Sequence, residues 1–225
     1  IEKLIDDEQK LLDVMAGQVT SNVAVEEEEE GKGKDLVESL GLKIAHIKEK
    51  GIIEGIRKMM GADGHLLKNV YEVMNVKTHK KYNDKLKEFK NEILLFHGSR
   101  SQNWYNILQT GLLIRPSGVI HNGSMFSNGC YFANKAGKSI GYTSLSGSYW
   151  AGGGSNSAML AIFQVNLGKE KHIHRHTSDC YNITEKNLLP HNSVYAHGGA
   201  DLRNDEFIVY NTSQCTVKYL IEIAR

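Results

Sequence analysis

Residues 204–210 read Asn204-Asp205-Glu206-Phe207-Ile208-Val209-Tyr210, a stretch typical of a buried strand with carboxylates at its start. Residues 207–210 are all β-branched or aromatic, which favours a strand. Similar apolar runs occur at residues 93–96, 130–133, 158–167 and 217–223. The sequence contains several short strands and short helices without regular alternation. It therefore predicts an α+β fold with a mainly antiparallel sheet.

Three other strings place polar or aromatic side chains beside predicted strands and a predicted helix. They are Leu95-Phe96-His97-Gly98-Ser99-Arg100, Gly129-Cys130-Tyr131-Phe132-Ala133 and Lys138-Ser139-Ile140-Gly141-Tyr142. Gly98 follows His97 at the end of a strand, and a residue without a side chain lets the backbone approach a ligand closely. Asn134 is predicted to cap the helix that carries Lys138. Ser139 lies three residues before Tyr142, which predicts that both lie on one helix face.

Each string also has an ordinary structural explanation when it is taken alone. His97 and Gly98 fit a turn that ends a strand, and Tyr131 fits a strand aromatic. Lys138 fits a solvated side chain. Glu206 fits an exposed acid at a strand start, with Asp205 as its rival for any catalytic role. The presence of all four strings in one order favours a single composite site instead.

In this order and at these separations, the four strings resemble the catalytic domain of a poly(ADP-ribose) polymerase. The resemblance runs from about Leu40 to Arg225. It implies the ADP-ribosyltransferase fold, in which a mainly antiparallel split sheet surrounds an NAD cleft, with a short helical segment before it. It also implies the His-Tyr-Glu triad of that family, carried here by His97, Tyr131 and Glu206. In the family the glutamate directly precedes an aromatic-Ile-Val-Tyr run, which selects Glu206 and leaves Asp205 solvated.

The resemblance further implies how NAD, the substrate that donates ADP-ribose, is held. His97 is expected to bond a ribose hydroxyl, and Gly98 and Ser139 the nicotinamide carboxamide. Tyr131 and Tyr142 are expected to enclose the nicotinamide ring, because an aromatic face attracts a cationic ring. The residues expected to contact NAD are His97, Gly98, Ser99, Tyr131, Ala133, Lys138, Ser139 and Tyr142.

The expected reaction transfers ADP-ribose from NAD to an acceptor and releases nicotinamide. Cleavage of the glycosidic bond passes through an oxocarbenium-like transition state, which a nearby carboxylate stabilises. Glu206 is expected to do this and to activate the acceptor, a protein or an ADP-ribose unit. Polymer formation is the first expectation. The alternatives are mono-ADP-ribosylation, or a module that binds NAD or ADP-ribose without turnover. Inhibitors that mimic nicotinamide are expected to bind the same pocket.

The N-terminal part differs in composition from the remainder. Residues 1–17 carry an apolar stripe at helical spacing, and residues 26–30 are five consecutive glutamates. We predict two regions: residues 1–35, a helix and an acidic loop that form a remnant of a helical regulatory region, and residues 36–225, the catalytic domain. A full regulatory domain is lacking, so autoinhibition of that kind is not expected. The stripe consists of Ile1, Leu4, Ile5, Leu11, Leu12 and Met15.

The net charge of +1 conceals an asymmetry, since residues 1–35 carry eleven acids and four bases, and residues 42–90 twelve bases and six acids. The basic segment lacks the interleaved aromatics of a nucleic-acid surface, so a solvated Lys-rich face is favoured. We expect nucleic-acid binding only through upstream domains. No apolar run is long enough to span a membrane, and no membrane partner is expected.

Three cysteines, Cys130, Cys180 and Cys215, fit neither a disulfide framework nor a metal spacing, which favours an intracellular protein. The nucleus is expected in a eukaryote and the cytoplasm in a bacterium. His172, His174 and His176 alternate, which predicts a polar strip on one face of an extended segment. Zinc is the less favoured alternative because no fourth ligand is specified, and no metal is expected. The His-Gly-Gly at residues 197–199 is predicted to be loop.

Overall fold

The computed structural model describes residues 36–114 and 125–225. The predicted N-terminal helix and acidic loop at residues 1–35 lie outside this part of the chain. The helices are α2 (Leu36–Ser39), α3 (Lys50–Met60), α4 (Val76–Lys85), α5 (Trp104–Thr110) and α6 (Ala136–Ile140). Short 3-10 turns are η1 (Gly61–Leu66), η2 (Ser101–Asn103), η3 (Ser178–Asn182) and η4 (Thr212–Gln214). No helix in the described ranges is long and apolar enough to cross a membrane.

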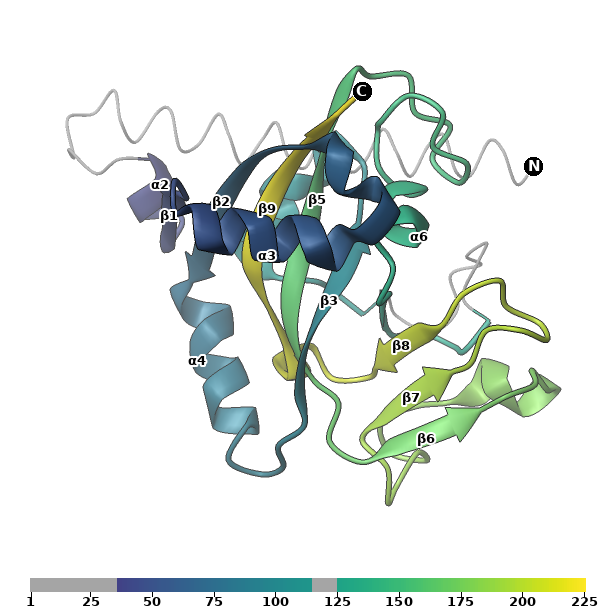
Figure 1. The fold of residues 1–225 in the computed structure, drawn as a ribbon. Helices are drawn as coiled ribbons and strands as arrows, with labels where there is room; N and C mark the ends of the chain where they lie inside the picture. Colours follow the sequence, from purple (N-terminus) through teal and green to yellow (C-terminus); the bar gives the residue numbers. More distant parts are fainter. Residues whose placement is uncertain (1–35, 115–124) are drawn as a thin grey trace.

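The strands form two sheets (Figure 1). The first has the order β1-β2-β9-β5-β3, and the second has the order β4-β8-β7-β6. All pairs are antiparallel except β6 with β7. The predicted α+β fold with a mainly antiparallel split sheet is therefore confirmed. The strands are β1 (Leu42–His46), β2 (Leu67–Asn75), β3 (Glu92–Gly98), β4 (Cys130–Phe132), β5 (Ser157–Asn166), β6 (Glu170–Ile173), β7 (Ser193–Ala196), β8 (Glu206–Val209) and β9 (Cys215–Ala224).

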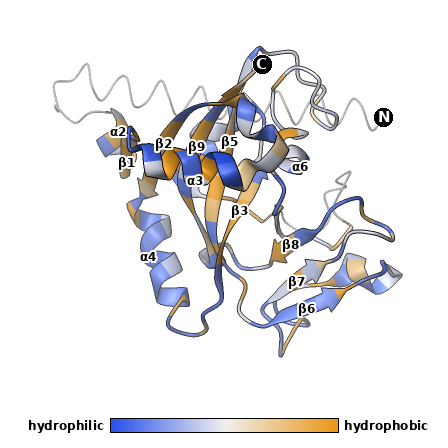
Figure 2. Cartoon of the chain, in the orientation of Figure 1, coloured by the Kyte–Doolittle hydropathy of each residue, from blue (hydrophilic) through white to orange (hydrophobic). Residues whose placement is uncertain are grey.

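The five-stranded sheet has a separate apolar cluster for each face. Helix α3 crosses one face, where Ile56 and Met60 pack against the central strands (Figure 1). The other cluster joins β5 and β9 to α5 and to the second sheet through Trp104, Phe132 and Phe207. Strands β3, β5 and β9 are predominantly hydrophobic, whereas β6 is hydrophilic (Figure 2). Strand β6 therefore forms an exposed edge, and the central strands form the core.

A single β-bridge joins the two sheets beside the predicted site. Phe96 N donates to Ala133 O at 2.8 Å, and Ala133 N donates to Phe96 O at 3.0 Å. Phe96 lies within β3 directly before His97, and Ala133 directly follows β4. The bridge consequently brings the end of β3, with His97 and Gly98, next to β4, with Tyr131.

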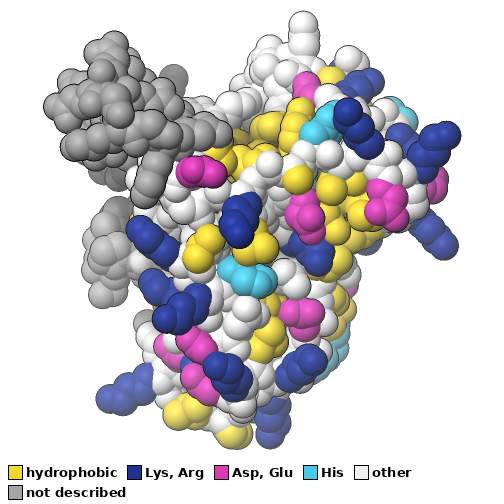
Figure 3. Space-filling view, turned by 90° about the vertical axis from the view of Figure 1, so that its left-hand side faces the viewer, with side chains coloured by type: hydrophobic (Ala, Val, Ile, Leu, Met, Phe, Trp, Pro, Cys, Tyr) yellow, Lys and Arg dark blue, Asp and Glu magenta, His cyan; other side chains and the backbone are white. Residues whose placement is uncertain are grey.

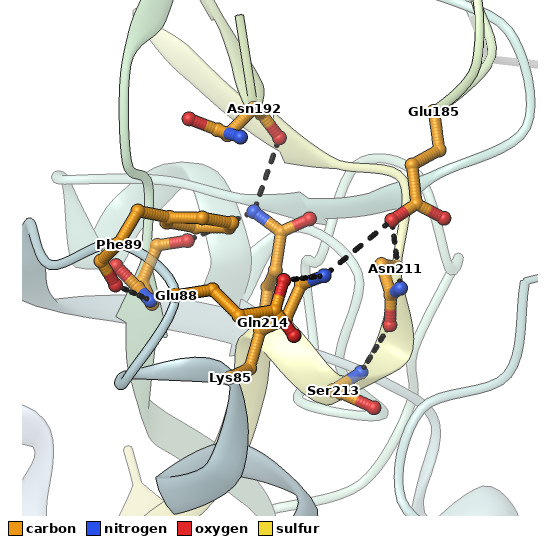
Figure 4. Close-up of polar contacts among 9 residues, drawn as sticks. Lys85, Glu88, Phe89, Glu185, Asn192, Asn211, Ser213 and Gln214 are labelled. Carbon is orange, nitrogen blue, oxygen red and sulfur yellow. Dashed lines mark hydrogen bonds and ion pairs between the residues drawn. The ribbon is translucent and has the colours of Figure 1, made fainter.

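A buried polar network fixes the far junction of the two sheets (Figure 4). Gln214 Nε2 donates to the carbonyls of Asn166, at 2.9 Å, and Asn192, at 3.0 Å. Asn166 Nδ2 in turn donates to Phe89 O at 2.7 Å. Gln214 precedes β9, Asn166 ends β5 and Asn192 precedes β7. Because buried amides need partners, this network sets the relative position of both sheets at the end of β5.

Candidate active site

His97 lies at the end of β3 among aromatic rings. Its Nδ1 lies 2.9 Å from Tyr131 O, and a carbonyl oxygen only accepts, so Nδ1 carries the proton. Burial lowers the pKa of His97, although the bond to Tyr131 opposes this. The neutral ring then presents Nε2 as a hydrogen-bond acceptor. The Phe163 and Phe132 rings lie 5.7 and 5.8 Å from the imidazole and fix its position.

Gly98 is the point of closest contact between β3 and α6. A Cβ at this position would overlap the carbonyl oxygen of Ser139. Ser139 itself is buried. The predicted pair of carboxamide-binding residues is therefore adjacent in space, although the residues are 41 positions apart in the sequence. Only glycine permits this approach at residue 98.

The Tyr131 hydroxyl forms hydrogen bonds with the backbone that precedes β4. It donates to Ser127 O at 2.6 Å and accepts from Phe126 N at 3.1 Å. Burial raises the pKa of Tyr131, so the hydroxyl stays neutral throughout the physiological range. These bonds also stabilise Ser127, which has a φ of 63°. In this structure Tyr131 contributes a fixed ring, and its hydroxyl orders residues 126–127.

Lys138 and Glu206 form an ion pair that joins α6 to β8. Lys138 Nζ donates to Glu206 Oε1, and their side chains are 13% and 12% exposed. The alternatives of a solvated Lys138 and an exposed Glu206 are therefore wrong. Ala196 faces Glu206 in the register of β7 and β8, which fixes the carboxylate at the start of the strand.

Asp205 is not the solvated acid that the sequence predicts. It accepts hydrogen bonds from Gly198 N at 2.9 Å, Tyr195 Oη at 3.0 Å and Asn134 Nδ2 at 3.1 Å. The bond from Gly198 is the main cause of the lowered pKa of Asp205. Asp205 therefore braces the segment before Glu206. The prediction that Asn134 caps α6 is also wrong, because its side chain is directed to Asp205 and Lys135 precedes the helix.

Tyr142 lies in a turn after α6 and not on the helix face with Ser139. Helix α6 ends at Ile140, and Tyr142 N donates to Ser139 O at 3.0 Å. The prediction of one helix face is wrong because Gly141 ends the helix, yet the turn keeps the two residues adjacent. The Tyr142 ring is 39% exposed and lies 6.0 Å from the Trp150 ring at 16°. Burial, and secondarily the charge of Glu206, raises the pKa of Tyr142.

The remaining predicted residues lie around His97. Ser99 Oγ accepts a hydrogen bond from Asn103 Nδ2 at 3.0 Å, and Ala133 is the buried partner of Phe96 in the bridge. Sequence reasoning did not include Asn103 or Trp104 in the site. Trp104 Nε1 is buried without a hydrogen-bond partner among the described residues, and its ring lies 6.4 Å from the His97 ring. The sequence signal that could have indicated them is the Asn103-Trp104 pair, which begins five residues after Gly98.

Trp150 is the other residue near the predicted site that sequence reasoning missed. Its backbone N donates to Gly141 O at 2.9 Å, which holds the exposed ring parallel to Tyr142. Trp150 occurs in the Gly- and Ser-rich segment 143–157, where the sequence shows neither a strand nor a helix period. A lone tryptophan in such a loop was the available signal.

The histidine strip is only partly as predicted. His172 lies on the edge strand β6 and His174 directly follows its end, whereas His176 Nε2 lies 2.7 Å from Met125 O. His197, in the predicted loop after β7, joins the first two through ring contacts. Within residues 36–114 and 125–225, no group of three or more His, Cys, Asp or Glu side chains is arranged to hold a metal.

The Lys-rich face also carries acidic and apolar side chains. On the face that includes α4, Lys and Arg alternate with acidic and apolar side chains (Figure 3). A shallow hollow of about 380 Å³ on this face is lined by Lys43, Glu72, Met74, His79 and Lys218, among others. It contains none of the predicted site residues. The mixture does not form the continuous basic surface that nucleic acid requires.

Comparisons with known proteins show which family the chain resembles over most of its length. The family model described as the poly(ADP-ribose) polymerase catalytic domain matches residues 48–225. A putative poly(ADP-ribose) polymerase-like protein of Invertebrate iridescent virus 6 is 34% identical over 164 residues, which cover 69% of this chain and 85% of the viral protein. Poly(ADP-ribose) polymerase 2 of Arabidopsis thaliana is 29% identical over 168 residues, 62% of this chain and 25% of the plant protein. The human poly(ADP-ribose) polymerase 2 is 29% identical over 160 residues, 59% of this chain and 26% of the human protein.

The fold and the matches together define a transferase domain that takes ADP-ribose from NAD. The chain belongs to the poly(ADP-ribose) polymerase catalytic domain family. It spans only about a quarter of the plant and human relatives, at 25% and 26% of their lengths.

Proposed function

We propose that this chain builds poly(ADP-ribose) on an acceptor, with His97, Tyr131 and Glu206 as its reactive triad. The observation that carries the proposal is that contacts join the four sequence strings in one region of the fold. The β-bridge brings His97 to Tyr131, the Gly98 contact brings Ser139, and the ion pair brings Lys138 to Glu206. NAD is the substrate, and no step requires a metal.

The nicotinamide end of NAD fits between Gly98 and Tyr142. Backbone groups of Gly98 and the Ser139 hydroxyl are suited to the carboxamide, which both donates and accepts hydrogen bonds. The Tyr142 ring is partly exposed and provides a face for the cationic nicotinamide, an arrangement worth about 1 kcal/mol or more when water is excluded. Nicotinamide-mimicking inhibitors fit the same place.

The ribose end fits between His97 and Glu206. The Nε2 acceptor of neutral His97 is suited to a ribose hydroxyl. The Glu206 carboxylate is suited to stabilise positive charge that develops on the ribose ring as nicotinamide leaves. Lys138 orients this carboxylate through their ion pair. Glu206 then accepts the proton of an incoming hydroxyl, whose oxygen forms the new bond to the ribose carbon.

A carboxylate that activates a hydroxyl is compatible with chain elongation, since the next acceptor is itself a ribose hydroxyl. The alternatives are mono-ADP-ribosylation and retention of ADP-ribose without turnover. Incubation with labelled NAD, followed by a denaturing gel, tests all three. We expect a ladder or smear. A single sharp band identifies mono-modification, and absence of label with normal NAD binding identifies a binding module.

The cellular location and the acceptors of the protein are part of the same proposal. The cysteines Cys130, Cys180 and Cys215 are buried free thiols, as in proteins of a reducing compartment. We infer an intracellular location and protein or ADP-ribose acceptors. We propose nucleic-acid contact only through upstream domains, and not through the catalytic domain.

A further inference from the structure

The two tyrosine rings proposed to enclose nicotinamide are held in different ways. The Tyr131 hydroxyl is fixed by hydrogen bonds with Ser127 O and Phe126 N. Within residues 36–114 and 125–225, no group forms a hydrogen bond with the Tyr142 hydroxyl, and only the backbone of Tyr142 is bonded, to Ser139 O. Tyr142 is also 39% exposed. The orientation of its ring must therefore come from a contact of another kind.

That contact is made by Trp150, whose indole is the one aromatic ring against the Tyr142 ring in the described part of the chain. The two centroids are 6.0 Å apart, and the planes are 16° from parallel. This is the offset-stacked arrangement that aromatic pairs favour. Trp150 therefore restricts the rotation of a ring that no hydrogen bond restricts.

The spacing of this pair decides which face of Tyr142 is open to a ligand. A ring inserted between Tyr142 and Trp150 would require roughly 7 Å, since stacked carbon atoms lie about 3.5 Å apart. The centroids are only 6.0 Å apart. Trp150 thus covers one face of Tyr142, and a nicotinamide ring has only the opposite face available.

Trp150 can orient another ring because its own position is fixed. Trp150 N and Ala151 N both donate to Gly141 O, at 2.9 and 3.0 Å. The indole lies against the α-carbon of Gly141, where an added Cβ would be 3.2 Å from Trp150 Cδ1. Tyr149 contacts the indole edge-on at 4.7 Å. Because Gly141 directly precedes Tyr142, these contacts join the loop to the residue that it orients.

The loop that carries Trp150 is closed by its own hydrogen bonds. Ser155 N donates to Ser144 O at 3.0 Å, and Gly153 N donates to Ser148 Oγ at 2.8 Å. Gly153 passes so close to Ser144 that an added Cβ would lie 2.4 Å from its carbonyl oxygen. Only glycine permits this approach. The Gly- and Ser-rich composition therefore forms a compact loop that fixes the indole without a strand or a helix.

We propose that Trp150 is a positioning residue for ADP-ribosyl transfer, which orients the Tyr142 ring so that nicotinamide stacks on its open face. This inference rests on the proposed nicotinamide site. Trp150 acts only through Tyr142 and does not contact NAD. Without Trp150, binding must also immobilise the Tyr142 side chain, a cost that corresponds to a loss of affinity of about two- to tenfold.

The test is titration calorimetry with benzamide, the probe of the nicotinamide site, in the absence of NAD. Trp150→Ala is expected to weaken binding by about two- to tenfold, whereas Trp150→Phe preserves a flat ring and is expected to retain affinity. Tyr181→Ala is the matched control, because Tyr181 lies on η3 and is 59% exposed, compared with 62% for Trp150. Thermal melts verify that each variant is folded.

Turnover gives a second measurement. In Trp150→Ala the KM for NAD is expected to rise by the same factor, with kcat little changed, because an oriented Tyr142 strengthens the binding of NAD and of the transition state equally. A decrease of kcat at unchanged KM would contradict the positioning role.

A double-mutant cycle separates positioning from direct contact. If Trp150 acts only through Tyr142, Trp150→Ala causes no further loss of benzamide affinity in a Tyr142→Ala background. A further loss there would show that Trp150 contacts the ligand, which overturns the proposal. Loss of affinity in Tyr142→Ala with none in Trp150→Ala would also overturn it, and would leave the proposed site intact. Unchanged affinity in Tyr142→Ala would refute the nicotinamide site and the role of Trp150 together.

Discussion

The α-carbon of Gly98 packs directly against the carbonyl oxygen of Ser139, with no space between them for a methyl group. This contact joins the end of β3 to α6, and thus joins the His97 string to the string that contains Lys138 and Tyr142. The geometry of the proposed nicotinamide site depends on it. The contact also makes Gly98 the most sensitive position in the site to a small change.

Gly98→Ala is expected to displace Ser139, because a Cβ would overlap its carbonyl oxygen. Overpacking of this kind costs about 1–3 kcal/mol of unfolding free energy, and we expect benzamide affinity to be lost with it. Gly55→Ala is the matched control, since Gly55 lies within α3 with nothing within 4 Å of a built Cβ. That change should stabilise the protein by about 0.5–1 kcal/mol. Urea unfolding and calorimetry measure both effects, and wild-type affinity in Gly98→Ala would contradict the pocket assignment.

Glu206→Gln should preserve folding and NAD binding but abolish polymer growth. The amide keeps the size of the carboxylate and loses the charge that activates the acceptor, an effect of about 10²–10⁴-fold. Asp205→Asn is the comparison. It retains an acceptor for Gly198 but weakens the brace, so it should lower stability more than it lowers the chemical rate. Labelled NAD and denaturing gels measure the products. Long chains from Glu206→Gln together with none from a folded Asp205→Asn would reverse the assignment.

Tyr142→Ala should weaken benzamide-like inhibitors by about 1–3 kcal/mol, through lost stacking and burial. Tyr149→Ala is the control, because Tyr149 is more exposed and its ring contacts Trp150 edge-on. Titration calorimetry with each variant gives the affinities. Equal affinity for both variants would place the nicotinamide ring elsewhere.

The stability of the domain should fall as the pH decreases below about 6.5, in part because of His97. Burial lowers the pKa of His97 in the folded state, so the unfolded chain binds the proton more tightly. The contribution of His97 is therefore complete above the unfolded pKa and is lost as the pH falls toward the folded pKa, by at most about 1.4 kcal/mol per pH unit. Chemical denaturation of wild type and His97→Gln between pH 5 and 8 isolates the contribution of His97 to the pH dependence of the free energy of unfolding. Parallel curves would show that His97 does not titrate differently on folding.

Deletion of residues 1–34 should leave NAD turnover intact, with no requirement for DNA. One amphipathic stripe and five glutamates are too small to cover a cofactor cleft as a full helical domain would. We predict that the apolar stripe with Leu4, Leu11 and Met15 packs on the core, so its removal is expected to lower stability by about 1–3 kcal/mol. Initial rates at saturating NAD, with and without nicked DNA, are compared for the full and shortened chains. A large increase on deletion, or strong DNA dependence of the full chain, would assign a regulatory role to this segment.

The sequence by itself determined the strands and the strings that end them. The strands that contain Phe96, Tyr131 and Phe207 could be predicted from short apolar runs rich in β-branched and aromatic residues. Such runs are typical of buried strands. The same runs place His97 and Glu206 at strand ends. The resemblance to the family then specified the reaction class and the expected roles of these residues, because the four motif strings occur in the order typical of that family.

Only the tertiary structure decided which side chains meet. Lys138 and Glu206 are 68 positions apart, and either could have been solvated as far as the sequence showed. Asp205 looked free, yet it is held by Gly198, Tyr195 and Asn134. His197 looked like loop, yet the parallel register of β6 and β7 stacks it on His174. Local periodicity reports the face on which a side chain lies. Its partner depends on strand order and register across the whole chain, which no local pattern encodes.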